Sequence, residues 1–148
     1  SIPVAGAALS TAMIAGVLGR IFWGVVADNV MPPRRLLGVL GLAMSLCAVL
    51  VAFVDASWPL ALVLPLCAAY GATAVGWNGV YLSEVARVVP PEQAAAATGG
   101  SLAMTYSGVV VLPLMFWATL AISDSYPAAF GATAALTAWR AAYFMRKL

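Results

Sequence analysis

The stretch Gly19–Arg35, GRIFWGVVADNVMPPRR, places an arginine inside an apolar run, and it decides how the whole chain is understood. Arg20 lies eight residues before Asp28, although only 8% of the 148 residues are charged and 64% are hydrophobic. A soluble domain of this size carries charge on about a quarter of its residues, which cover its surface. The mean hydropathy of +1.02 therefore indicates a chain whose solvent is lipid.

Uncharged runs separated by short charged segments divide the sequence into five predicted helices. A membrane-spanning helix needs about 20 mostly apolar residues, each adding about 1.5 Å along the axis. The runs that meet this requirement lie at about residues 3–27, 35–54, 58–84, 93–121 and 126–145. We therefore predict an all-α fold, a polytopic transmembrane bundle in which five spanning helices form one domain over residues 1–148.

The basic residues outside these runs predict the orientation of the chain. They all fall on one side of the expected membrane: Arg34, Arg35, Arg87, Arg146 and Lys147. The second and fourth loops carry only Asp55 and Asp124 as charged residues. Cytoplasmic loops are enriched in Lys and Arg, so we expect a multi-pass protein of the cell inner (plasma) membrane with a cytoplasmic carboxyl terminus. An odd number of spans then places Ser1 outside, and we expect further helices, an amino-terminal half, upstream of it.

The residues of common catalytic and metal sites are scarce. The chain has no His, which excludes His-based triads and the common zinc sites. Cys47 and Cys67 stand alone in different predicted helices and are expected to be small buried apolar residues. We predict no enzymatic activity, no cofactor and no metal ion. The lack of a basic patch interleaved with aromatic residues argues against a nucleic-acid partner.

Polar and aromatic side chains follow one face of the third predicted helix at spacings of three or four residues. They are Tyr70, Thr73, Trp77, Tyr81 and Glu84. Lipid does not favour a face with a carboxylate, a phenol and an indole, so we expect this face to line the bundle interior or a wet cavity, with Asn78 beside it. The alternative is an aromatic belt at the membrane interface, which suits Tyr81 better than Tyr70 or Trp77.

The fourth predicted helix carries a second stripe, made of small and hydroxyl residues. Its members are Thr98, Ser101, Thr105 and Gly108. Stripes of this kind usually mark close packing between membrane helices, and only Thr105, near mid-membrane, is predicted to contact a ligand. Pro65 and Pro113 are expected to kink the third and fourth helices.

Arg20 requires a partner inside the membrane. It lies about 12 Å deeper than Asp28, and an unpaired arginine at the centre of a membrane helix costs at least ~2.5 kcal/mol. Two partners stay open: the carboxylate of Glu84 on the third predicted helix, or a bound anion. Glu84 also has Arg87 one helical turn away, which can satisfy it instead.

Two stretches of the chain resemble the carboxyl-terminal half of a major facilitator superfamily transporter. They are GRIFWGVVADNVMPPRRLL at residues 19–37 and YGATAVGWNGVYLSEVARVVPPEQAAAATGG at residues 70–100. The loop motif of that family is matched at Gly24, Asp28, Arg34 and Arg35. The resemblance implies that the five helices correspond to helices eight to twelve of a twelve-helix fold, and that the amino-terminal half of the same transporter is the missing partner.

The resemblance also implies a cytoplasmic latch. In this family the loop aspartate, here Asp28, faces the positive amino end of a helix in the opposite half and helps to close the cytoplasmic side. Gly24 would allow the close crossing of helices. Arg34 or Arg35, together with Glu84 and its neighbour Arg87, resembles the charge relay that holds this latch.

Arg20 itself resembles an arginine of anion-carrying branches of the family, which include monocarboxylate, oxalate and nitrate carriers. There the arginine contacts the substrate, and its planar guanidinium can pair bidentately with a carboxylate or nitrate. By this resemblance Arg20 holds the anion. The pocket around it is formed by Tyr70, Trp77, Asn78 and Thr105.

The predicted function is secondary active transport of a small organic anion by alternating access, with proton coupling as an option. Two alternatives stay open. One is an exporter of neutral or cationic amphiphiles that uses the aromatic face, and the other is a membrane scaffold or enzyme subunit that transports nothing.

Overall fold

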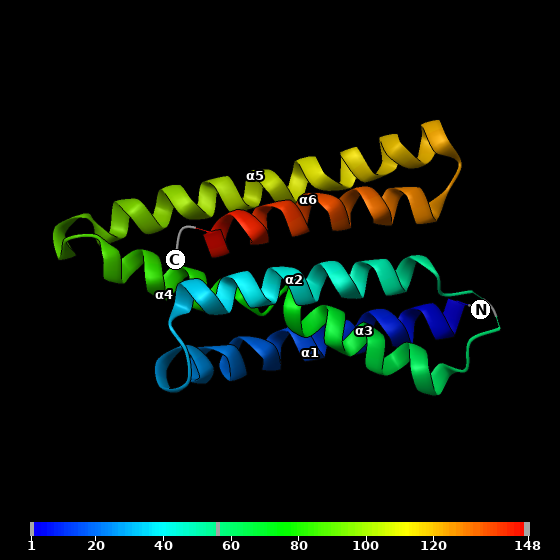
Figure 1. Ribbon diagram of the computed structural model, residues 1–148, viewed down its shortest axis with the longest axis horizontal. Helices are drawn as coiled ribbons and strands as arrows, with labels where there is room; N and C mark the ends of the chain where they lie inside the picture. The colour runs from blue at the N-terminus through cyan, green and yellow to red at the C-terminus, as the bar shows by residue number, and fades with distance from the viewer. Residues whose placement is uncertain (1, 56, 147–148) are drawn as a thin grey trace.

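Uncharged apolar segments long enough to span a membrane are expected to form helices, because a helix satisfies the hydrogen bonds of its own backbone. The computed structural model describes residues 2–55 and 57–146, and these residues contain helices and no strand. The helices are α1 (Ile2–Asn29), α2 (Pro33–Ala52), α3 (Leu60–Ala74), α4 (Trp77–Val88), α5 (Pro91–Ser123) and α6 (Tyr126–Arg146) (Figure 1). The prediction of an all-α bundle is confirmed. Lys147 and the side chain of Arg146, which were used to predict orientation, lie outside the described part.

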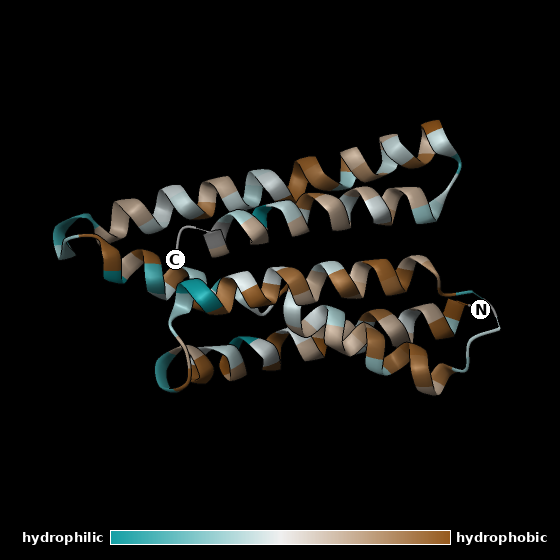
Figure 2. Ribbon diagram, in the orientation of Figure 1, coloured by the Kyte–Doolittle hydropathy of each residue, from teal (hydrophilic) through white to brown (hydrophobic). Residues whose placement is uncertain are grey.

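Four helical segments of the described residues are long and apolar enough to cross a membrane: α1, α2, the continuous segment Leu60–Val88, and α5. They correspond to the first four predicted spans. The fifth prediction is confirmed as a 21-residue helix, α6, but α6 is not among the four because it is less apolar. Figure 2 shows hydrophilic residues gathered mostly at the connections between helices, as expected for a bundle surrounded by lipid.

The bundle is organised around the long contact between α2 and α6. Helix α3 packs on α1 and α2, while α4 touches α1, α2 and α5, and α5 also packs on α6. The core cluster lies where α2 meets α4 and contains Leu36, Leu40 and Val80, with Trp23 and Trp77 packed against it. This cluster fixes the position of α4, which carries several of the side chains predicted to be functional.

Glycines allow α1 and α3 to approach closely. A Cβ atom on Gly19 would lie 2.8 Å from the carbonyl oxygen of Ala72, and one on Gly71 would overlap the carbonyl of Ala12. Only a residue without a side chain fits these positions, as is common where membrane helices cross. Gly24, by contrast, has open space around it.

The helix predicted over residues 58–84 corresponds to the apolar segment Leu60–Val88, but α3 and α4 are separated within it by two residues. The segment is broken at Val75–Gly76, between α3 and α4. Gly76 permits the break, because a Cβ there would overlap the Ala72 carbonyl and lie 2.6 Å from the Trp23 ring. Pro65 and Pro113, in contrast, lie inside the uninterrupted helices α3 and α5.

Two indole groups satisfy backbone carbonyls at this break. The Nε1–H of Trp23 on α1 donates to the carbonyl of Ala72 at 2.8 Å, and the Nε1–H of Trp77 donates to the carbonyl of Ala74 at 3.0 Å. Breaks in membrane helices persist only where neighbouring groups satisfy the released backbone. The break is therefore a built feature of the bundle.

Candidate functional site

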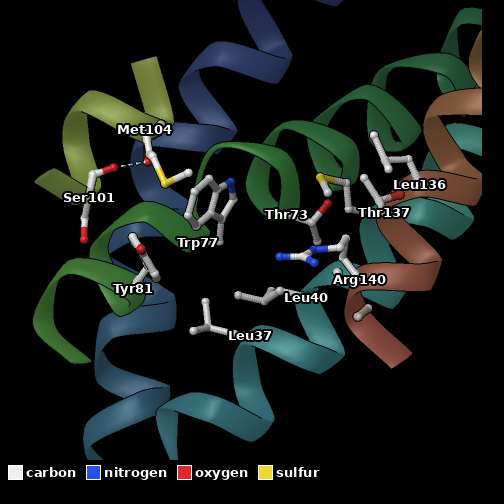
Figure 3. Close-up of a pocket in the computed structure, with 14 residues that line it drawn as sticks. Leu37, Leu40, Thr73, Trp77, Tyr81, Ser101, Met104, Leu136, Thr137 and Arg140 are labelled. Atoms are coloured by element: carbon white, nitrogen blue, oxygen red, sulfur yellow. Dashed lines mark hydrogen bonds between the residues drawn. The ribbon is translucent and has the colours of Figure 1, made fainter. Parts of the chain in front are cut away.

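A cavity of about 460 Å³ lies among α2, the α3–α4 segment, α5 and α6. Its size suits a small organic ligand. Half of the described lining residues are Leu, Met, Gly or Ala, and the polar and aromatic ones are Thr73, Trp77, Tyr81, Ser101, Thr105, Thr137 and Arg140. Figure 3 labels all of these side chains except Thr105 and shows the labelled ones around one space between the helical segments.

Two aromatic rings form one wall of the cavity. Trp77 and Tyr81 are one turn apart on α4, with ring centroids 5.6 Å apart and planes inclined at 59°. Trp77 is held in place by its hydrogen bond to Ala74 and by packing against the core cluster. This wall offers a rigid apolar surface to a ligand.

Most hydroxyl groups of the lining donate to their own helix. Thr73 donates to the carbonyl of Ala69 at 2.9 Å, Thr105 to that of Ser101 at 2.9 Å, and Thr137 can donate to those of Thr133 or Ala134 at 3.0 Å. A hydroxyl has one proton, so these groups present oxygen lone pairs to the cavity. They suit a ligand that donates hydrogen bonds better than one that accepts them.

Among the described residues, Arg140 supplies the only formal charge of the cavity lining. Its guanidinium carbon lies 5.9 Å from the ring centroids of both Trp139 and Tyr143 on the same helix. Figure 3 shows the guanidinium pointing from α6 into the cavity, toward the side where Trp77 and Leu40 lie. Among residues 2–55 and 57–146, no carboxylate lies within ion-pair distance of it. An arginine without a carboxylate in a cavity is suited to bind an anion.

Sequence reasoning missed Arg140. The signal that could have found it is the one that identified Arg20, namely an arginine inside an otherwise uncharged run. Arg20 is exposed like Arg140 but lies elsewhere, on α1, and its backbone oxygen would be 3.4 Å from a Cβ on Gly79 of α4. Gly79 follows Trp77 by two residues, about 200° around the helix, so Arg20 and the cavity lie on opposite sides of α4. Its assignment as the anion contact stays a prediction.

The other predicted pocket residues divide into two groups. Trp77 and Thr105 line the cavity, whereas Tyr70 and Asn78 are partly buried outside its lining. Tyr81 and Thr73, from the same predicted face as Trp77, also line it. The polar face of the third predicted helix therefore points into the bundle across the break.

A separate ion cluster joins α2 to α4 beside their connections. Glu84, only 12% exposed, accepts from Nε of Arg87 at 3.0 Å and from an Nη of Arg87 at 2.6 Å. Nε of Arg34 lies 3.5 Å from the other carboxylate oxygen. The alternative that Glu84 pairs with Arg20 is wrong, since Glu84 is occupied by these two arginines. Arg35 and Asp28 are exposed, and their roles in a latch stay predictions.

The remaining titratable and sulfur groups form no further centre. Cys47 and Cys67 are free, partly buried thiols on α2 and α3, less buried than expected. Hydrogen bonds from the hydroxyl and backbone N–H of Ser57 lower the pKa of Asp55 in the loop after α2. Within the described ranges, no cluster of three His, Cys, Asp or Glu side chains could hold a metal ion.

No protein-family model, curated protein or solved structure matches this chain. Its function is therefore argued from the cavity, the charges and the helices that carry them.

Proposed function

We propose that this chain is part of a secondary transporter that moves a small organic anion across the cell inner membrane by alternating access. The observation that carries the proposal is the guanidinium of Arg140 in a cavity whose described lining residues include no carboxylate. Three of the four helical segments around the cavity, namely α2, Leu60–Val88 and α5, are apolar enough to cross a membrane. The guanidinium of Arg140 is exposed on α6 within the lining of this cavity, where it is available to bind an anion.

Arg140 is exposed on this chain, so its guanidinium would cost free energy wherever it met lipid without a counter-charge. A guanidinium stays protonated at any working pH, and an unpaired arginine at the centre of a membrane helix costs at least ~2.5 kcal/mol. Water or a bound anion lowers this cost. A carboxylate suits the site because it can accept two parallel N–H bonds from the guanidinium fork.

The broken helix α3–α4 supports a transport role. Substrate sites of secondary transporters commonly lie where a membrane helix is interrupted. Here the break at Val75–Gly76 comes directly before Trp77, and α4 carries both the aromatic wall and Glu84 of the ion cluster. A movement of α4 against α3 would change the cavity and the cluster together.

The resemblance to the major facilitator superfamily completes the proposal. It supplies an amino-terminal half as the other wall of the transport path, a cytoplasmic carboxyl terminus, and a latch in which Gly24, Asp28 and Arg35 join the ion cluster. It also offers proton coupling as an option.

The test is uptake by proteoliposomes that contain the complete natural protein to which residues 1–148 belong. We expect saturable uptake of radiolabelled benzoate or lactate, and no uptake of glucose. Arg140→Lys should lower uptake at least about tenfold, because lysine keeps the charge but loses the planar fork. If neither anion is taken up, the transport proposal is wrong.

Arg20→Lys is the matched variant on the other side of α4. A larger loss of uptake in Arg20→Lys than in Arg140→Lys would return the anion contact to Arg20 and leave anion transport intact.

A further inference from the structure

The hydrogen-bond donors that the cavity offers are few and of different kinds. The hydroxyls of Thr73, Thr105 and Thr137 can donate to backbone carbonyls of their own helices. The indole N–H of Trp77 donates to the backbone carbonyl of Ala74. Within the described residues, the donors of the lining without an acceptor are the guanidinium of Arg140 and the hydroxyls of Tyr81 and Ser101. One donor is therefore charged and two are neutral.

These donors lie at two ends of the cavity. Figure 3 shows Arg140 on one side, Tyr81 and Ser101 on the other, and the ring of Trp77 between them. The arrangement has a structural cause, since Arg140 belongs to α6 whereas the two hydroxyl residues belong to the adjacent helices α4 and α5. The middle of the cavity is bounded by Trp77 and by the aliphatic side chain of Leu40.

A ligand that matches this arrangement has three parts. A carboxylate pairs with Arg140, a flat apolar body lies against Trp77, and a neutral group that accepts hydrogen bonds reaches Tyr81 and Ser101. A second carboxylate at the far end would meet hydroxyl groups and no cation. A volume of about 460 Å³ accommodates one substituted aromatic ring with room to spare.

We propose that the cavity is selective for small monocarboxylates with a flat apolar body and a neutral hydrogen-bonding group at the opposite end. Arg140 recognises the charge, while Tyr81 and Ser101 recognise the distal group. This inference rests on the proposed transport of organic anions and specifies its substrate class.

Isothermal titration calorimetry on the complete natural protein in nanodiscs tests the selectivity. The probes are benzoate, 3- and 4-hydroxybenzoate, terephthalate and 4-hydroxybenzyl alcohol. We expect one of the hydroxybenzoates to bind about three- to tenfold more tightly than benzoate, the gain of one neutral hydrogen bond. Terephthalate and the uncharged alcohol should bind at least about tenfold more weakly than benzoate.

Variants test separately which residue binds the ligand at each end of the cavity. Arg140→Gln should weaken benzoate and the hydroxybenzoates alike, at least about tenfold. Tyr81→Phe should remove the advantage of the preferred hydroxybenzoate and leave benzoate unchanged. Tyr106→Phe is the matched control, because Tyr106 is exposed on α5 and does not line the cavity.

The outcomes separate this inference from the proposed function. Unchanged benzoate affinity in Arg140→Gln would overturn the inference, because the guanidinium would then be paired with another part of the complete protein. Terephthalate bound as tightly as the preferred hydroxybenzoate would also overturn it. If proteoliposomes take up these anions while either result holds, transport stands and only the selectivity is wrong.

Discussion

The ion cluster and the cavity both contain guanidinium groups, and they treat them in opposite ways. In the cluster, Arg34 and Arg87 share the largely buried carboxylate of Glu84. In the cavity, the described partners of the Arg140 guanidinium are the faces of two aromatic rings of its own helix. The difference is that the arginines beside the connection of α2 and α4 have a carboxylate partner, whereas the arginine in the cavity lining has no ion pair with a described carboxylate.

The largest expected effect comes from making the cavity resemble the cluster. Leu136 lines the cavity one turn before Arg140, so Leu136→Glu would place a carboxylate at the i, i+4 position that favours an ion pair. Affinity for benzoate should fall on the order of 100-fold, because the guanidinium becomes occupied and a like charge faces the ligand. Calorimetry measures this loss. Leu136→Gln controls for shape and polarity, and an equal loss there would show that charge is not the cause.

The reverse change makes the cluster resemble the cavity. Glu84→Gln leaves Arg34 and Arg87 without their carboxylate, and we expect the free energy of unfolding to fall by about 1–2 kcal/mol. The value lies between those of surface and buried pairs because Glu84 is buried while its partners are exposed. Unfolding in mixed micelles, followed by circular dichroism, measures it. Glu92→Gln, at the start of α5, should change stability by less than about 1 kcal/mol.

A smaller effect is expected at the break, which positions α4 for both regions. Trp23→Phe keeps an aromatic ring but removes the N–H that satisfies the carbonyl of Ala72, at a cost of about 1 kcal/mol. The same micelle unfolding assay detects it. Trp117→Phe is the control, since Trp117 is 68% exposed on α5. Equal stabilities of the two variants would mean that the indole bond does not hold the break.

The smallest effect is expected at the α2–α6 contact beside the cavity. The hydroxyls of Ser45 and Thr137 are hydrogen-bonded to each other at 2.6 Å. Ser45→Ala should cost about 0.6 kcal/mol, the average for such bonds between membrane helices. Ser107→Ala is the control, because Ser107 bonds only within α5 among the described residues. A double-mutant cycle with Thr137→Val that shows no coupling would contradict the prediction.

Predictions from the sequence were most successful for properties that depend on the side chains of one segment alone. Hydropathy identifies the helices because a residue meets lipid according to its own side chain, and helical spacing placed Thr73, Trp77 and Tyr81 on one inward face. The sequence did not predict the break at Val75–Gly76. A kink was expected instead at Pro65, because proline often kinks helices. Whether a glycine permits a break depends on the atoms packed against it, here the ring of Trp23.

The sequence by itself therefore determined the apolar character, the fold class and the approximate helices of this protein, since these follow from the composition of each segment. Only the tertiary structure decided which charges are paired. Glu84 could have met Arg20 or Arg87, and both Arg20 and Arg140 interrupt apolar runs in the same way. The packing of α4 against its neighbours distinguishes them, because the partner of a charge is set by distances between helices that no single segment contains.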